Sequence, residues 1–176
     1  MTPTTKSALL DAVESPFGKL FLLLQEHIKT EVPEVMYIEQ DLGQLGTDDP
    51  RNCMSFPGVL IDFPNTPFSN LQGKNQLANP VISITLVFDN YSQTWQDAPL
   101  DVRKTGLKYL EVEQKIFMAI QNLESDFCEA LNRTAATGHN RNDVGLRVRE
   151  LTFTSEFEDY SCDDDSQRIQ VSLRTE

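Results

Sequence analysis

The octapeptide "VISITLVF", Val81 to Phe88, decides how the rest of this 176-residue sequence is interpreted. Its side chains alternate with a period of two, which predicts a β-strand. One face would carry Ile82, Ile84, Leu86 and Phe88, and the other Val81, Ser83, Thr85 and Val87. Because apolar residues occupy both faces, we expect this strand near the centre of a sheet.

Two segments upstream of this strand share its period. The segment from Glu34 to Leu42 predicts a half-buried strand, and "PGVLIDF", residues 57–63, predicts another. The first would turn Met36, Ile38 and Leu42 inward, and the second Val59, Ile61 and Phe63. A turn is expected over residues 43–52. Residues 64–80, rich in Pro and Asn, predict a long loop, and loops of that length are usually functional or mobile.

Helical periodicity predicts two main helices. The first has Ser15 as N-cap, Pro16 at the first position and an end at Val32-Pro33, and Pro16 would separate it from a shorter helix over residues 6–13. The second is expected over residues 107–123, with one or two further helical turns over 125–131 and then a connection over 133–145. Its buried stripe would be Leu107, Leu110, Gln114, Phe117, Ile120 and Leu123.

The C-terminal region alternates again on both sides of an acidic segment. Leu151, Phe153 and Phe157 precede that segment, and Ile169, Val171 and Leu173 follow it. We expect an antiparallel pair of strands with the acidic residues at its end. Together these elements predict an α+β fold: a single mainly antiparallel (mixed) sheet with two main helices packed on one face. Residues 1–176 would form a single domain.

Composition excludes several classes of protein. The formal net charge of −12 repels phosphate backbones and argues against a basic groove that wraps nucleic acid. The longest apolar stretch, "LFLLL", is far shorter than the roughly 20 residues that a bilayer requires, so no membrane partner is expected. The N-terminus lacks the pattern of a secretory signal, which favours the cytoplasm. Three isolated cysteines predict free thiols and no zinc site.

No catalytic motif, cofactor motif or metal motif is present, so we expect no enzyme activity, no cofactor and no metal. Pairing His139 with Cys128 or Cys162 as base and nucleophile has no supporting motif. An alternative remains open: a small acidic cytoplasmic binding module that holds a divalent cation in the acidic loop. That loop consists of Glu158, Asp159, Asp163, Asp164 and Asp165. It lacks EF-hand spacing, which favours a hydrated turn.

Aromatic residues in polar loops are candidates for contacts with other proteins. Phe68 lies in the long loop, and Tyr91 and Trp95 lie in the loop over residues 89–101. Such residues are enriched at protein interfaces. The alternative for Tyr91 and Trp95 is that they fold back and cover the core.

The order of elements resembles that of tail-terminator and tail-completion (head-tail joining) proteins of tailed bacteriophages and prophages. The stretches that carry the resemblance are "FGKLFLLLQEHIKTEVPEVMYIEQDLGQL", "NPVISITLVFDNYSQTW", "YLEVEQKIFMAIQNL" and "LRVRELTFTSEFEDYSCDDDSQRIQVSLRTE". They cover most of the chain, and the proline-rich loop over residues 64–80 departs from the pattern.

The resemblance implies a structural protein without an active site. Such a protein forms a ring with copies of itself, commonly a hexamer, at the head-proximal end of the tail. The ring stops polymerisation of the tail tube, contacts proteins of the head and neck, and lets DNA pass through its lumen. It would assemble in the host cytoplasm and remain at the junction of tail and head in the virion.

Overall fold

The computed structural model describes residues 10–89, 92–141 and 145–162. Its main sheet has five strands in the order β1-β2-β5-β7-β6. These are β1 (Tyr37–Gln40), β2 (Gly58–Asn65), β5 (Val81–Phe88), β7 (Leu146–Thr154) and β6 (Asn132–Arg141). Only β1 and β2 pair in parallel, and all other neighbours are antiparallel. The predicted α+β class with a mixed, mainly antiparallel sheet is confirmed.

Strand β5 is central, as its sequence predicts. It has the predicted bounds and pairs with β2 on one side and β7 on the other, with Ile84 opposite both Ile61 and Leu151. These three residues point to the face of the sheet that the helices cover, and all are buried. The alternation of apolar residues therefore identified the middle of the sheet correctly.

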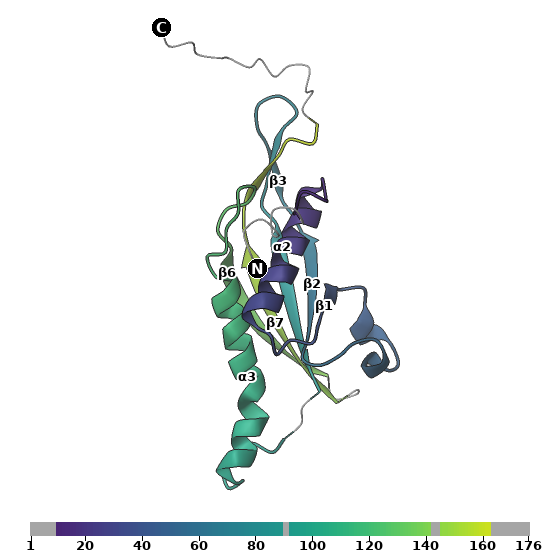
Figure 1. Ribbon diagram of the computed structural model, residues 1–176, viewed down its shortest axis with the longest axis vertical. Coiled ribbons are helices and arrows are strands. Elements are labelled where there is room, and N and C mark those ends of the chain that lie inside the picture. The colour runs from purple at the N-terminus through teal and green to yellow at the C-terminus, as the bar shows by residue number, and fades with distance from the viewer. Residues whose placement is uncertain (1–9, 90–91, 142–144, 163–176) are drawn as a thin grey trace.

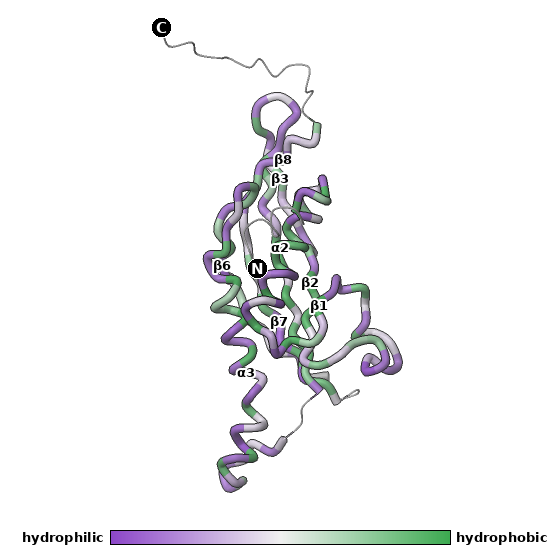
Figure 2. The backbone as a smooth tube through the Cα atoms, viewed as in Figure 1, coloured by the Kyte–Doolittle hydropathy of each residue, from purple (hydrophilic) through white to green (hydrophobic). Residues whose placement is uncertain are grey.

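Both main helices cover this one face (Figure 1): α2 (Pro16–Glu31) and α3 (Leu100–Ile120). Helix α2 begins as predicted, because the Ser15 side chain accepts a hydrogen bond from the Gly18 amide and Pro16 takes the first position. Residues 11–15 are not helical, which confirms the break. The shorter helix predicted over residues 6–13 lies largely outside the described residues. Hydrophobic segments gather where α2 crosses the sheet (Figure 2).

The predicted inner stripe of α3 is only partly correct: Ile120 is buried and Phe117 and Leu123 pack against the core, but Leu107, Leu110 and Gln114 are exposed. Val112, Ile116 and Ile120 are buried against the sheet, whereas Leu107 and Leu110 face solvent. The helix also begins seven residues earlier than predicted, at Leu100 instead of Leu107, and its N-terminal part extends past the end of the sheet (Figure 1). Apolar residues occupy two sides of this helix, so periodicity alone could not decide which side is buried.

Three arginines fasten α3 to β6 and β7. Arg149 makes a bidentate pair with Glu113, from Nε to Oε2 at 2.6 Å and from Nη2 to Oε1 at 3.0 Å. Arg147 and Arg133 stack on the rings of Tyr109 and Phe117, respectively. Glu113 is therefore both buried and paired.

A second sheet, β3-β4-β8, lies beyond the first and corrects the prediction of a single sheet. It consists of β3 (Phe68–Asn70), β4 (Gln76–Ala78) and β8 (Phe157–Asp159). Each of its strands is next in the chain to a strand of the main sheet: β3 follows β2, β4 precedes β5, and β8 follows β7. The order β3-β4-β8 therefore repeats the order β2-β5-β7. Prolines, which lack an amide donor, lie at the join, at Pro64, Pro67 and Pro80. The predicted loop over residues 64–80 is thus a bent continuation of a hairpin.

The predictions for the last third of the chain need two corrections. Residues 132–141, expected to be a connection, form the edge strand β6, and Ser125 and Cys128 form a tight turn instead of a further turn of helix. Strand β7 has β5 and β6 on its two sides, so it cannot pair with residues 169–173 as predicted. Those residues lie outside the described part of the chain.

The opposite face of the main sheet is partly covered by residues 43–56, which include the 3-10 helices η1 (Gln44–Gly46) and η2 (Pro50–Asn52). Met54 from this segment packs with Leu60, Val87 and Val148. Strand β1 is shorter than predicted. Met36 and Leu42, expected to be buried with Ile38, lie outside it and are exposed.

Candidate functional site

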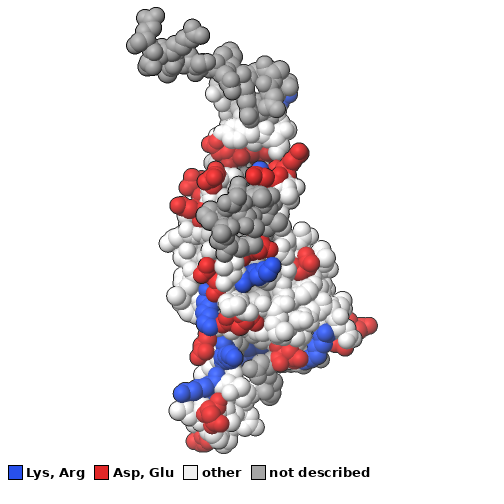
Figure 3. All heavy atoms as spheres, in the orientation of Figure 1, with Lys and Arg blue, Asp and Glu red and all other residues white. Residues whose placement is uncertain are grey.

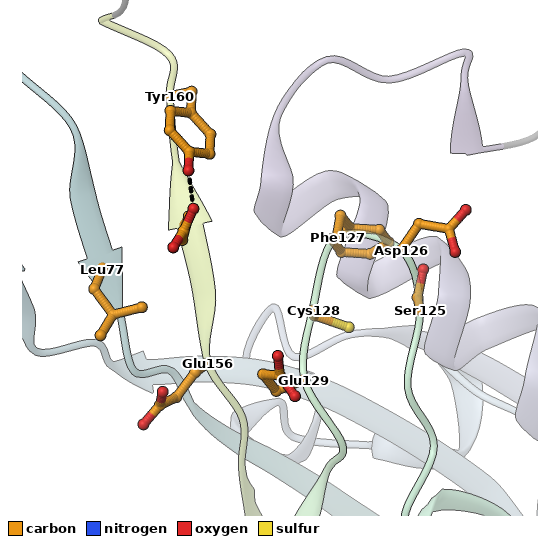
Figure 4. A pocket seen from close by; sticks show the side chains of 9 residues that line it. Leu77, Ser125, Asp126, Phe127, Cys128, Glu129, Glu156 and Tyr160 are labelled. Carbon is orange, nitrogen blue, oxygen red and sulfur yellow. Dashed lines mark hydrogen bonds between the residues drawn. The ribbon is translucent and has the colours of Figure 1, made fainter. Parts of the chain in front are cut away.

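A cleft of about 610 Å³ lies between β8 and the turn at residues 125–128 (Figure 4). The amide of Glu129 donates to the carbonyl of Glu156 at 2.8 Å, and Ser155 Oγ donates to the carbonyl of Glu129 at 2.6 Å. These bonds join the two walls at one end. Four carboxylates line the cleft, those of Asp126, Glu129, Glu156 and Glu158.

The cleft is acidic, but its geometry does not assemble a recognisable reactive centre. Burial raises the pKa of the Cys128 thiol to about 11, so the thiol is protonated at neutral pH and is a poor nucleophile. Within residues 10–89, 92–141 and 145–162, no group of three or more His, Cys, Asp or Glu is placed to hold a metal ion.

The acidic loop predicted as a candidate cation site is only partly described. The Tyr160 hydroxyl donates to Glu158, and Asp159 Oδ1 accepts the Ser161 amide at 2.9 Å. Both acidic residues belong to β8, which pairs with β4. Asp163, Asp164 and Asp165 lie outside the described residues.

The candidate interface residues are not brought together. Phe68 is 46% exposed in β3, and Trp95 is 54% exposed in the segment before α3. Strand β3 and the start of α3 lie toward opposite ends of the molecule (Figure 1). The indole Nε1 of Trp95 donates to Gln93 Oε1 at 3.4 Å. This exposure does not agree with the alternative that Trp95 covers the core. Tyr91 lies outside the described residues.

A polar cluster that the sequence analysis did not find lies on the face of the sheet away from the helices. Glu150 on β7 accepts a hydrogen bond from Ser83 Oγ on β5 at 2.8 Å and contacts Nε2 of His139 on β6 at 2.9 Å. The hydrogen bonds with His139 and Ser83 lower the pKa of Glu150. The order serine, carboxylate, histidine differs from a nucleophilic triad, in which histidine contacts the serine. His139 therefore lies with Glu150 and not with Cys128.

The alternation of side chains along β5 and β7 could have predicted part of this cluster from the sequence. Ser83 and Glu150 both occupy positions that face away from the helices. Only the assignment of residues 132–141 to a strand, which the sequence analysis missed, would have added His139.

Large apolar side chains are exposed in several parts of the fold, among them α3 and the two ends of β1, and Phe68, Leu71, Trp95 and Tyr160 are exposed as well. On α3 the exposed ones are Leu100, Leu107, Leu110 and Met118, and beside β1 they are Met36 and Leu42. Charge is also unevenly distributed. On the face drawn in Figure 3, most of the visible basic side chains lie in the lower half, where acidic side chains are interspersed with them, and the upper half carries mainly acidic ones. Among the described residues, no helix has the length and apolar character needed to cross a membrane.

No family model matches the chain, and no curated protein matches it. Among solved structures, a chain from the virion of a native gene transfer agent particle is similar, with a TM-score of 0.39 and 12% sequence identity. The similarity covers 77% of this chain and 84% of that chain. This weak structural likeness to a virion protein is too low to carry an argument about function.

Proposed function

We propose that this chain is a structural subunit of a phage-like particle, and specifically a tail-terminator or tail-completion protein. Copies of it would form a ring that caps the tail tube and joins it to the head. The proposal places the protein in the host cytoplasm during assembly and at the junction of tail and head afterwards. It requires no catalysis and no cofactor.

The observation that carries the proposal is the set of exposed apolar side chains on α3 and at the two ends of β1. Leu100 and Met118 on α3 are 63% and 67% exposed, and Met36 and Leu42 beside β1 are 69% and 73% exposed. Isolated exposed leucines are ordinary, but grouped ones are typical of surfaces that bind other proteins. A subunit that assembles with its own kind and with a tube needs such surfaces. The resemblance in element order agrees with this role.

The charge of the chain suits a ring through which DNA passes. A formal net charge of −12 offers DNA few cations to replace its counterions, so DNA would remain mobile in the lumen. Neighbouring proteins of the tail and neck are the other partners that this role requires.

Light scattering on a size-exclusion column tests the proposal, with the chain at several concentrations and at low and moderate salt. The expected species has about six times the chain mass of 20.0 kDa. Negative-stain electron microscopy should then show rings with an open centre. A monomer under all these conditions would contradict assembly in solution.

A calcium titration separates this role from that of a small acidic cation-binding module. A ligand that binds only the folded chain raises its melting temperature. If millimolar calcium raises the melting temperature and magnesium does not, the binding module becomes the better interpretation. The ring proposal expects no difference between the two cations.

A further inference from the structure

Strand β8 has a strand partner on one side only. In the second sheet β4 lies between β3 and β8, and it pairs with β8 from Ala78 opposite Phe157 to Gln76 opposite Asp159. The other side of β8 faces the cleft toward the turn at residues 125–128 (Figure 4). Strand β8 is therefore an edge strand, and an uncovered strand edge is a template for one more strand.

The backbone of Glu158 points to the cleft. The carbonyl of Glu156 accepts the amide of Glu129, so the backbone groups of Glu156 point away from β4. Backbone groups alternate between the two sides of a strand, so those of Phe157 point to β4 and those of Glu158 point to the cleft. Among the described residues, no hydrogen bond engages the amide or the carbonyl of Glu158. The edge is occupied at Glu156 and free from Phe157 onward.

The walls of the cleft are acidic and apolar and contain no basic side chain. The lining residues with these characters are Asp126, Glu129, Glu156 and Glu158, and Leu77, Phe127 and Tyr160. The two wall segments, residues 123–132 and 154–162, contain no Lys, Arg or His. Lys74 lies in the turn between β3 and β4 and does not line the cleft. The occupant that this edge favours is an extended chain with both apolar and basic side chains.

The chain continues from this edge into a segment of that kind. The described residues end at Cys162, shortly after β8. The sequence that follows the three aspartates is "SQRIQVSLR", residues 166–174, which contains two arginines and no acidic residue. Its apolar residues Ile169, Val171 and Leu173 alternate with polar ones, which predicts a strand. A strand that follows another after a short turn is its natural antiparallel neighbour.

The alternation of this segment matches the two faces of β8. Residues directly opposite each other in an antiparallel pair share one face. A register that sets Val171 opposite Phe157 adds an apolar side chain to a buried row, because Phe157 and its partner Ala78 are in the core. The same register puts Arg168 on the face that carries Glu158. It also leaves residues 163–165, the three aspartates, as the turn, where they stay hydrated and outside the acidic cleft.

We propose that residues 168–171 of the same chain add to the free edge of β8 as an antiparallel strand and fill the cleft. The added strand pairs with the backbone of Glu158, and Arg168 lies beside the Glu158 carboxylate. Strand β7, which the sequence analysis predicted as the partner, has both sides occupied, whereas β8 has one side free. The contact covers an exposed edge and offsets part of the acidic charge of the cleft. It does not depend on the proposed ring.

Amide hydrogen exchange of Glu158 in the full chain tests the contact. If the added strand accepts this amide, its exchange should be slower than the intrinsic rate by about tenfold or more. The double variant Ile169→Asn with Val171→Asn removes the apolar side of the segment and should return the exchange to near the intrinsic rate. Gln170→Asn with Ser172→Asn changes only the polar side and is the matched control, which should keep the slow exchange. Exchange within β5 should be the same in all these chains, which shows that the fold is kept.

Charge reversal tests the position of Arg168. Arg168→Glu adds a carboxylate to the acidic cleft and should speed the exchange of the residue 158 amide, measured against its intrinsic rate. Combining it with Glu158→Arg restores a pair of opposite charges and should slow the exchange again, so the two changes are coupled. Arg174→Glu lies beyond the paired residues and should have little effect.

Three outcomes contradict the inference. Exchange of the Glu158 amide at its intrinsic rate in the unchanged chain means that the edge is free. Equal exchange in the Ile169/Val171 variant and its control means that residues 168–171 do not cover the edge. Slow exchange that is lost on dilution means that another copy supplies the strand, which contradicts docking within one chain. The mass in solution decides the proposed ring separately, so the two can fail independently.

Discussion

The two edge strands of the main sheet, β1 and β6, differ in whether side chains hydrogen-bond to their outward-facing amides and carbonyls. At β1, the carbonyl of Ile38 accepts from Gln25 Nε2, the amide of Gln40 donates to Glu39, and the carbonyl of Gln40 accepts from Gln44 Nε2, each at 2.9 Å. At β6, Gln121 Oε1 accepts the amide of Arg133 at 3.0 Å. Within the described part of β6, no comparable side-chain bond covers the backbone of residues 135–139.

The difference teaches that one edge is closed to strand pairing and the other is open. An uncovered row of amides and carbonyls is a template for another strand. Closing β1 therefore leaves its flank to side-chain contacts. The flanks also differ in how their helices are fastened, by neutral amides at β1 and by arginines at β6 and β7.

The strongest fastening gives the largest expected effect. Arg149→Met removes the bidentate partner of Glu113, whose side chain is only 12% exposed. Leaving that carboxylate buried without a cation should cost about 3 kcal/mol in the free energy of unfolding, measured by urea denaturation. Adding Glu113→Leu should recover much of the loss. If Arg149→Met alone costs less than about 0.5 kcal/mol, the pair does not hold α3 to the sheet.

The closed edge should show a smaller effect. Gln44 is buried, and its side chain both donates to the Gln40 carbonyl and accepts the Leu42 amide at 2.7 Å. Gln44→Leu keeps the volume but removes both bonds, which should cost about 1 to 2 kcal/mol in urea denaturation. Gln93→Leu, at an exposed glutamine outside the sheet, should cost much less. If the two variants lose the same free energy of unfolding, the β1 edge does not depend on the hydrogen bonds of Gln44.

The polar cluster beside the open edge makes stability depend on pH. Hydrogen bonds with His139 and Ser83 lower the pKa of Glu150 from its ordinary value of 4.5. The folded chain therefore keeps this carboxylate ionised where the unfolded chain has begun to take up a proton. The resulting stability is present above about pH 4.5 and is lost as the pH falls through the lower, folded pKa.

Glu150→Gln tests this dependence. At neutral pH the variant should be less stable by about 1 kcal/mol, a modest cost because the side chain is about one third exposed. The difference from the unchanged chain should shrink as the pH falls below 4 in urea denaturation. Glu124→Gln, at an exposed position, serves as the control. A difference that is constant with pH would mean that Glu150 does not titrate with the fold.

Sequence patterns predicted the elements that have one apolar side and clear ends. Strand β5 has the predicted bounds, and α2 has the cap that Ser15 and Pro16 predict. Strand β6 was missed because "NRTAATGHNR" buries little, and an edge strand with small polar residues has no apolar period. The exposure of Leu107 and Leu110 was missed because Arg149 and Glu113, which orient α3, are 36 residues apart.

The candidate site was harder to predict than the fold. Phe68 and Trp95 are exposed, as surface contacts require, but β3 and the start of α3 lie toward opposite ends of the molecule. The exposure of Leu107 and Leu110 on α3 depends on which side of the helix is covered. That is a property of packing between distant segments, which local periodicity does not contain.

The smallest expected effect on stability comes from charging the open edge. Thr137 is exposed in the middle of β6, and Thr137→Lys should change the free energy of unfolding by less than about 0.5 kcal/mol. A lysine on an edge strand nevertheless disfavours pairing with other strands, so the variant should aggregate more slowly on mild warming, as followed by light scattering. Gln40→Lys, on the closed edge, should alter that rate little, because the side chains of Gln25, Glu39 and Gln44 already cover its backbone. The opposite ranking would mean that β1 is the edge that pairs, and the comparison between the two edges would be reversed.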